Sequence, residues 1–222
     1  MGAQFQIDLE KYSLAKFKRS LETRHVVPSR KILQDDLDSR FAALERMGIA
    51  SLKALIDALK TKPKIETFAQ ASGLPTEYLT LLGREARSYL SKPLRLDKLP
   101  GLDAKHLEKL AEAGLQNSKQ LFLQAQQLDQ RKELAQEIGL AIEDLNEIFA
   151  LCDLSRIYGV GPVFARMIYD LGIRSVGDFL RHSAADFVRM YEEQTRKKAD
   201  FSLAEIQFSL ELAKELDIAL EI

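Results

Sequence analysis

The chain has 222 residues, of which 46% are hydrophobic and 29% charged, a composition typical of a folded protein with a sizeable core. No stretch approaches the roughly 18 apolar residues of a membrane span, so no membrane partner is expected. The net charge of −1 excludes a generally basic nucleic-acid binder. Leu, Ala, Glu, Lys and Gln dominate, Trp is absent and β-branched residues are scarce, which predicts an all-α fold.

Charge is distributed unevenly along the chain. Residues 1–64 carry thirteen Lys/Arg and eight Asp/Glu, a net charge of +5. Residues 65–153 carry ten and fourteen, a net charge of −4, and residues 154–222 carry nine and eleven, a net charge of −2. Attraction to a polyanion is therefore expected to be local and strongest in the N-terminal part.

Residues 1–27 are predicted to form an amphipathic basic helix, over residues 8–23, and a linker. The apolar side of this helix recurs at helical spacing: Leu9, Leu14, Phe17 and Leu21. Lys16, Lys18 and Arg19 lie on its other side and form a candidate surface for phosphate or for an acidic partner. The alternative is a solvated helix face.

Three segments of about 60 residues then repeat one pattern, and we call them the first repeat (28–92), second repeat (93–153) and third repeat (154–222). Each has a glycine where a helix ends and an N-cap residue three positions later: Gly48 and Ser51, Gly114 and Asn117, Gly172 and Ser175. Each finishes with a closing helix, predicted over residues 76–90, 142–153 and 203–216. The sequence therefore predicts tandem all-α units packed as a helical array.

The third repeat opens on Ile157-Tyr-Gly-Val-Gly161, which has the hydrophobic–hydrophobic–Gly–hydrophobic–Gly pattern of a helix–hairpin–helix turn. The glycines permit a tight turn, and Pro162 suits the first position of the next helix. Such a turn points backbone N–H groups outward, where they can bind a phosphate. The candidate nucleic-acid-binding residues are therefore those of the turn and the arginines on either side of it: Arg156, Gly159, Val160, Gly161 and Arg166. The alternative is that the glycines serve only the geometry of the turn.

The other two repeats carry carboxylates at the corresponding hairpin. The second keeps Gly101 but has Asp103, and the first has Asp35, Asp36 and Asp38 and neither glycine. A carboxylate at this place repels a phosphate and can itself occupy the helix N-terminus. Asp103 and Asp38 are therefore predicted to be helix caps, and phosphate binding is favoured most at the third hairpin.

Catalytic and metal chemistry has no support in the sequence. The single Cys152 excludes an intrachain disulfide, suits a reducing cytoplasm and is expected to be an inert core thiol. His25, His106 and His182 lack the spacing of metal ligands. No nucleophile elbow, Ser-His-Asp order or dinucleotide fingerprint is present. We therefore expect a non-enzymatic protein without a cofactor, a metal or a small-molecule substrate.

Several of these motifs resemble the tandem helix–hairpin–helix modules of a bacterial domain family of unknown function. The resemblance is carried by Asp153-Leu-Ser-Arg-Ile-Tyr-Gly-Val-Gly161, by Ile173-Arg-Ser-Val-Gly-Asp-Phe-Leu180 and by Leu99-Pro-Gly-Leu102, and it covers residues 28–216. The third repeat is also similar to the helical N-terminal domain of RecA/RadA-type recombinases. Their ATPase core has no counterpart, because no phosphate-binding loop with a Gly-Lys-Ser/Thr ending is present.

The resemblance implies an accessory protein, and two functions stay open. In the first, the third hairpin binds nucleic acid weakly and without sequence preference, with an affinity that falls steeply with salt. In the second, the hairpins are a rigid scaffold for a protein–protein adaptor, which the near-neutral charge and the two acid-substituted hairpins favour. A cytoplasmic location is expected in either case.

Overall fold

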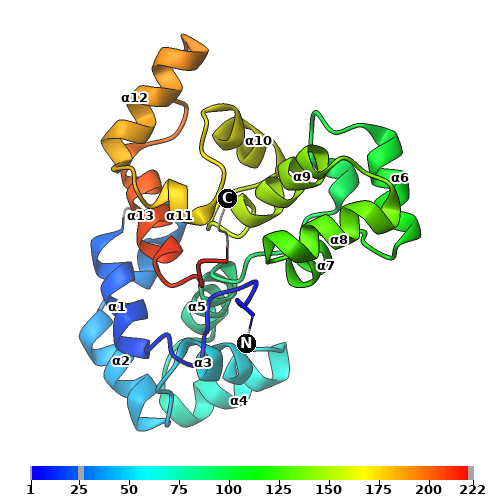
Figure 1. Ribbon diagram of the computed structural model, residues 1–222. Coiled ribbons are helices and arrows are strands. Elements are labelled where there is room, and N and C mark those ends of the chain that lie inside the picture. The colour runs from blue at the N-terminus through cyan, green and yellow to red at the C-terminus, as the bar shows by residue number, and fades with distance from the viewer. Residues whose placement is uncertain (1, 25–27, 220–222) are drawn as a thin grey trace. The chain divides into compact units, whose positions relative to one another are not determined.

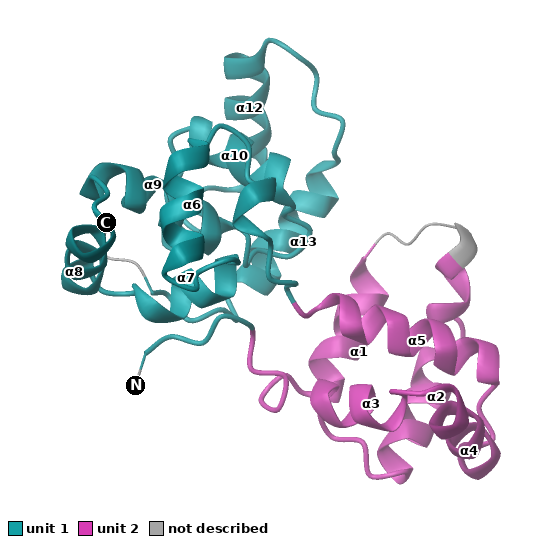
Figure 2. Ribbon diagram, turned by 90° about the vertical axis from the view of Figure 1, so that its right-hand side faces the viewer, with its two compact units in different colours: residues 1–6, 91–222 teal, residues 7–90 magenta. Residues whose placement is uncertain are grey.

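The computed structural model describes residues 2–24 and 28–219 (Figure 1). Within these ranges the chain forms thirteen α-helices and two 3-10 helices and no strand, which confirms the all-α prediction. No helix in these ranges is long and apolar enough to cross a bilayer. The chain divides into two compact units (Figure 2): unit 1 is formed by residues 1–6 and 91–222, and unit 2 by residues 7–90.

Unit 2 contains the first predicted repeat and the helix before it. Its elements are α1 (Leu14–Thr23), η1 (Pro28–Leu33), α2 (Leu37–Arg46), α3 (Leu52–Ala58), α4 (Lys62–Ser72) and α5 (Thr76–Ser88). Aromatic rings form much of the core: the Phe17 ring centroid lies 6.1 Å from that of Phe41 and 5.2 Å from that of Tyr89. Such edge-on and tilted contacts add stability beyond the area they bury.

The first helix of unit 2 is shorter than predicted. It begins at Leu14 rather than at residue 8, because Ser13 is its N-cap and accepts a hydrogen bond from the Lys16 N–H at 3.1 Å. Leu9 precedes the helix in a turn, yet it is buried together with the predicted apolar face: Leu14, Phe17 and Leu21. The predicted linker at residues 25–27 lies outside the described residues.

Unit 1 contains the second and third predicted repeats. Its elements are η2 (Leu96–Lys98), α6 (Ala104–Glu112), α7 (Ser118–Gln124), α8 (Leu128–Ile138), α9 (Ile142–Leu154), α10 (Pro162–Asp170), α11 (Val176–Phe179), α12 (Ala184–Thr195) and α13 (Leu203–Ala213). Helix α9 is central, because it packs against α7, α8 and α10 and every residue from Ile148 to Leu154 is buried. A helix that is apolar nearly all round suits this interior position.

The only cysteine lies on this central helix. Cys152 is fully buried, and burial raises the pKa of its thiol, since the thiolate would lose its hydration. The thiol is therefore protonated at neutral pH and has the environment of an unreactive core residue.

The predicted glycine turns are confirmed in both units. Gly48, Gly114 and Gly172 have φ values of 80°, 79° and 91°, in the left-handed region that strains residues with a Cβ atom. The N-cap residues that follow are confirmed as well, since each side chain accepts a hydrogen bond from the backbone N–H three positions on: Ser51, Asn117 and Ser175. These local signals set the direction in which each following helix leaves the turn.

The closing helices begin where the sequence predicts. Helices α5, α9 and α13 start at Thr76, Ile142 and Leu203, and their ends lie within one turn of the predicted ends. Gly73 and Gly139 precede the first two of them with φ values of 72° and 64°. Left-handed glycines thus end α4 and α8 and separate each from its closing helix.

We expect Gly114→Ala to lower the free energy of unfolding by about 1–2 kcal/mol, because alanine is strained at a left-handed φ. An added Cβ would meet no atom within 4 Å, so the loss comes from the backbone alone. Gly114→Asn is the matched control and should cost less, since Asn tolerates this conformation. Urea denaturation followed by circular dichroism measures both, and equal losses would contradict the argument.

Candidate functional site

The third hairpin joins α9 to α10 through residues 155–161. Gly159 is exposed and has a φ of 79°, so this corner of the turn requires glycine. The Val160 N–H donates to the Ile157 carbonyl at 3.1 Å and closes the turn, and Val160 is 8% exposed. The Val160 N–H, which was predicted to contact a phosphate, therefore has a partner inside the turn.

The N-terminus of α10 has no side-chain cap. Gly161 is its N-cap with an extended backbone, Pro162 follows, and no acidic residue lies in the first turn. A Cβ at Gly161 would meet no atom within 4 Å, so the space beside it is open. The first-turn N–H groups of this helix therefore keep their capacity to bind an anion.

The other two hairpins hold their carboxylates differently. Asp103 caps α6 as predicted, since its Oδ1 accepts a hydrogen bond from the Lys105 N–H at 2.8 Å. The prediction that Asp38 is a helix cap is wrong: Asp36 is the N-cap of α2, and Asp38 lies inside the first turn. From there its carboxylate reaches across to α1 and pairs with the Lys18 ammonium.

Arg156 lies in the interior of unit 1. The residue is 1% exposed, its guanidinium is paired with the Asp153 carboxylate, and its Cζ lies 4.2 Å from the centroid of the Phe122 ring. The same guanidinium donates to three backbone carbonyls, at 3.1, 3.1 and 2.7 Å: those of Phe5, Gln4 and Asp217. A phosphate could therefore reach Arg156, which was predicted to contact one, only by displacing these partners.

Arg166 lies beside the hairpin but is neutralised there. Its guanidinium pairs with the Glu147 carboxylate and, through Nε, with Asp170 Oδ1 at 2.9 Å. It also lies against the second hairpin, where a Cβ at Gly101 would be 3.2 Å from Arg166 Nη1. Two acidic partners leave this arginine little net charge to offer a phosphate.

The predicted basic residues of α1 belong to unit 2, whereas the hairpin belongs to unit 1. Lys16 and Arg19 are exposed. Lys18 is not a free cation, because it pairs with Asp38 and, at 3.1 Å, with Glu22. The residues that the sequence predicts to bind nucleic acid therefore belong to two different units.

The two units also have net charges of opposite sign. Unit 2 has fifteen Lys/Arg and eleven Asp/Glu, a net charge of +4, and unit 1 has seventeen and twenty-two, a net charge of −5. The third hairpin thus lies in the acidic unit. Long-range attraction of a polyanion is available from unit 2 and not from the unit that carries the hairpin.

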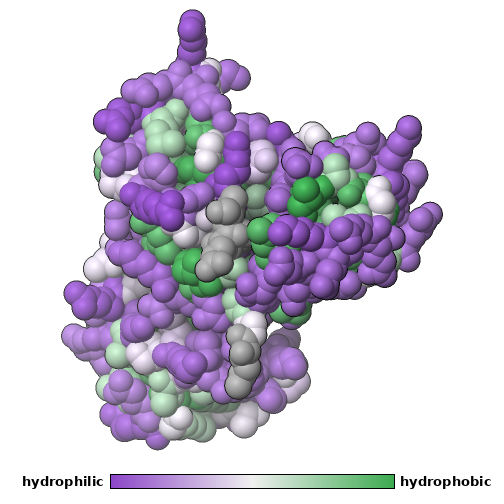
Figure 3. All heavy atoms as spheres, in the orientation of Figure 1, coloured by the Kyte–Doolittle hydropathy of each residue, from purple (hydrophilic) through white to green (hydrophobic). Residues whose placement is uncertain are grey.

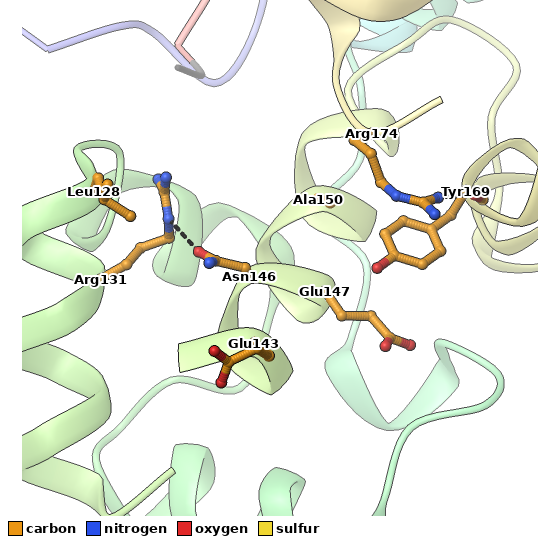
Figure 4. A pocket seen from close by; sticks show the side chains of 8 residues that line it. All are labelled: Leu128, Arg131, Glu143, Asn146, Glu147, Ala150, Tyr169 and Arg174. Atoms are coloured by element: carbon orange, nitrogen blue, oxygen red, sulfur yellow. Dashed lines mark hydrogen bonds between the residues drawn. The ribbon is translucent and has the colours of Figure 1, made fainter. Parts of the chain in front are cut away.

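A small pocket of about 200 Å³ lies between α8, α9 and α10. Figure 4 shows Arg131 on one side of it and Tyr169 with Arg174 on the other. Arg131 Nε donates to Asn146 Oδ1 at 2.7 Å, and the Arg174 guanidinium lies 3.8 Å from the Tyr169 ring centroid. These polar side chains pair with one another and do not converge on a common position where a ligand could bind. The described part of the chain has no group of three or more His, Cys, Asp or Glu placed to hold a metal.

An apolar surface that was not predicted from the sequence adjoins the third hairpin. The rings of Phe164 and Phe201 lie 5.3 Å apart, and they are flanked in sequence by Val163, 73% exposed, and Leu203, 54% exposed. We call these four residues the α10–α13 patch. Figure 3 shows hydrophobic atoms at the surface between α12 and α10, in largely hydrophilic surroundings. The sequence signal was the adjacent apolar pair, Val163 and Phe164, directly after the hairpin.

We expect Arg156→Met to lower the free energy of unfolding by about 3–5 kcal/mol, because it leaves the Asp153 carboxylate buried without its partner. Arg166→Met is the matched control and should cost at most about 1 kcal/mol, since its ion pairs are partly exposed. Urea denaturation of both variants measures the difference. Similar losses in the two would show that the Asp153–Arg156 pair contributes no more than a surface pair.

No curated protein and no solved structure matches the chain. The family model described as "Domain of unknown function (DUF4332)" matches residues 100–216, which run from the second hairpin through α13. The match covers more than half of the 222 residues and agrees with the predicted resemblance to a domain family of unknown function. The chain therefore belongs to the family Domain of unknown function (DUF4332).

Proposed function

We propose that the protein is a non-enzymatic helical adaptor that binds a protein partner through the α10–α13 patch. The observation that carries this proposal is the exposure of Val163, 73%, and Leu203, 54%, which lie close in sequence to two half-buried phenyl rings that pack together. A cluster of exposed apolar side chains is typical of surfaces that another macromolecule covers. We place this function in a reducing compartment, the bacterial cytoplasm, in keeping with the single buried cysteine.

The scaffold of the adaptor, in this proposal, is three copies of one helix–hairpin–helix unit: α2–α5, α6–α9 and α10–α13. Support comes from the same order of helices, with a left-handed glycine after the first helix of each set and an N-cap before the second. The first N–H of that second helix is also bonded to an earlier segment in each set. Leu52 and Ser118 donate to backbone carbonyls at 2.9 and 2.7 Å, and Val176 donates to Asp153 Oδ2 at 2.7 Å.

The contacts made by the side chains of the hairpins favour a structural role for the hairpins over phosphate binding. Asp103 fills the helix N-terminus in the second hairpin. In the third, Arg156 is buried and Arg166 is held by two carboxylates. The cations that a phosphate clamp would need are therefore committed to the protein itself.

We expect Val163→Asp and Leu203→Asp to weaken binding of the partner at least about tenfold, because each places a charge in an apolar contact. Both changes fall in the first turn of a helix, where an acidic residue is favourable, so the fold is retained. The measurement is quantitative recovery of a cross-linked partner from lysate of the source cell, together with the solution mass by light scattering.

Thr76→Asp is the matched control for this experiment. It adds the same charge at an exposed first-turn position of α5, in unit 2. Recovery of the partner should match that of the unaltered chain. A chain that recovers no partner and stays monomeric, or a partner whose recovery ignores both patch variants, would rule out this function.

A second function, weak binding of nucleic acid through the third hairpin, is favoured by one specific observation. Helix α10 has no side-chain cap, no acidic residue in its first turn and open space beside Gly161. Its N–H groups suit a phosphate oxygen, and binding by so few contacts would be independent of sequence and confined to low salt.

We expect Gly161→Asp to weaken binding of a labelled DNA or RNA oligonucleotide about 3- to 30-fold at low salt, because the new carboxylate takes the place of the phosphate. Gly161→Asn is the matched control, since it is an equally good N-cap without the charge and should bind like the unaltered chain. Fluorescence anisotropy measures both. Equal affinities for the two variants would remove the third hairpin from any nucleic-acid contact.

A further inference from the structure

The N-terminal segment of residues 2–6, which we call the arm, belongs to unit 1 although the whole of unit 2 separates it in sequence from the rest of that unit. The arm contains no helix or strand. Its Phe5 side chain is nevertheless 2% exposed, and the Phe5 ring packs edge-on against the Phe122 ring of α7 at 5.6 Å. Burial of a phenyl ring removes a large apolar surface from water, which holds the arm against unit 1.

Gln126 binds both backbone groups of one arm residue. The Ala3 N–H donates to Gln126 Oε1 at 2.7 Å, and Gln126 Nε2 donates to the Ala3 carbonyl at 2.7 Å. Gln126 is only 6% exposed, so its amide is held in place by the fold. A side-chain amide that pairs with an N–H and a C=O of the same residue acts as a neighbouring strand would.

Arg156 and Asp217 bind the next two residues of the arm. Arg156 donates to the carbonyls of Gln4 and Phe5, both at 3.1 Å, and the Gln4 N–H donates to Asp217 Oδ2 at 2.9 Å. The guanidinium is oriented in advance by its ion pair with Asp153. Backbone groups of three successive arm residues are thus bound by side chains of unit 1, two of them at buried residues. We call Phe122, Gln126, Arg156 and Asp217 the arm site.

The arm site is selective at two positions. A Cβ on Gly2 would lie 2.6 Å from Gln126 Oε1, and that oxygen is already fixed by its bond to the Ala3 N–H, so glycine is required there. Phe5 supplies the ring that meets Phe122. Ala3 and Gln4 are bound through their backbones. The pattern that the arm site selects is therefore glycine, two residues other than proline, because both of their N–H groups are bound, and an aromatic residue.

We infer that the arm site is a recognition site for a short, non-helical protein segment of the pattern Gly-X-X-aromatic, and that the chain's own arm occupies it as an internal ligand. The contacts join unit 1 side chains to backbone groups and one ring, so the same contacts form with a segment of another polypeptide. The inference goes beyond the proposed adaptor function, because it concerns a second site and states the chemistry of the segment that this site binds. The tethered arm competes with that segment through its high effective concentration.

The test uses the full chain and a labelled peptide with the sequence of residues 1–6, Met-Gly-Ala-Gln-Phe-Gln. Gly2→Val displaces the arm through its contact with Gln126 and leaves the arm site intact. We expect the Gly2→Val chain to bind the peptide at least about tenfold more tightly than the unaltered chain, because the tethered competitor is weakened. A peptide with alanine in place of its phenylalanine should bind at least about tenfold more weakly than the original.

Two further variants complete the design. Phe5→Ala weakens the arm without a clash and should also raise the affinity for the peptide, which covers the case in which Gly2→Val lowers the thermal midpoint of the chain. Gln126→Ala added to either variant should abolish the gain. The inference is overturned if neither arm variant binds the peptide more tightly than the unaltered chain, or if the alanine peptide binds equally well.

The proposed adaptor function and this inference can each be rejected without rejecting the other. Val163→Asp should leave peptide binding unchanged, because the α10–α13 patch and the arm site share no residue. Peptide binding without any partner that depends on Val163 would reject the patch and keep the arm site. A Val163-dependent partner without peptide binding would reject the arm site alone.

Discussion

The buried ion pair of Asp153 and Arg156 is the interaction on which the arrangement of unit 1 depends. Its carboxylate accepts the Val176 N–H at the start of α11, and its guanidinium holds the arm and the segment after α13. Two charges removed from water are stabilising only when hydrogen bonds satisfy their remaining groups. Here those bonds come from backbone groups of three separate segments. The pair therefore fixes the third hairpin, the arm and the C-terminal segment relative to one another.

Three helices of unit 1 show how the unpaired groups at a helix N-terminus can be satisfied in different ways. The N-terminus of a helix presents unpaired N–H groups and a partial positive charge. For α6, the Asp103 side chain accepts a hydrogen bond from one of these N–H groups. For α11, the carboxylate of Asp153 on α9 accepts the Val176 N–H. Only α10 of these three helices has no carboxylate at its first turn, which is why the second proposed function is confined to it.

Local features of the fold were readable from the sequence, and long-range ones were not. The glycine turns and N-caps follow from residue types a few positions apart, so Gly114 and Asn117 were predicted correctly. The role of Arg156 was missed because the Phe5 carbonyl that it binds lies 151 residues away. Its position before the hairpin suggested a surface cation, whereas burial by distant segments decides its role. The α10–α13 patch was missed for the same reason, since Phe164 and Phe201 meet only in the folded unit.

The separation between the arm and its site has a consequence for the order in which the protein is made. A ribosome adds roughly 5–20 residues per second, so about 8–30 s pass between the synthesis of Phe5 and that of Arg156, 151 residues later. Unit 2 can bury its aromatic core during that interval, because all of its residues precede those of the arm site. The ring of Phe5 stays without its native partner until Phe122 has been synthesised, so the arm can dock only after all of unit 2 has been made.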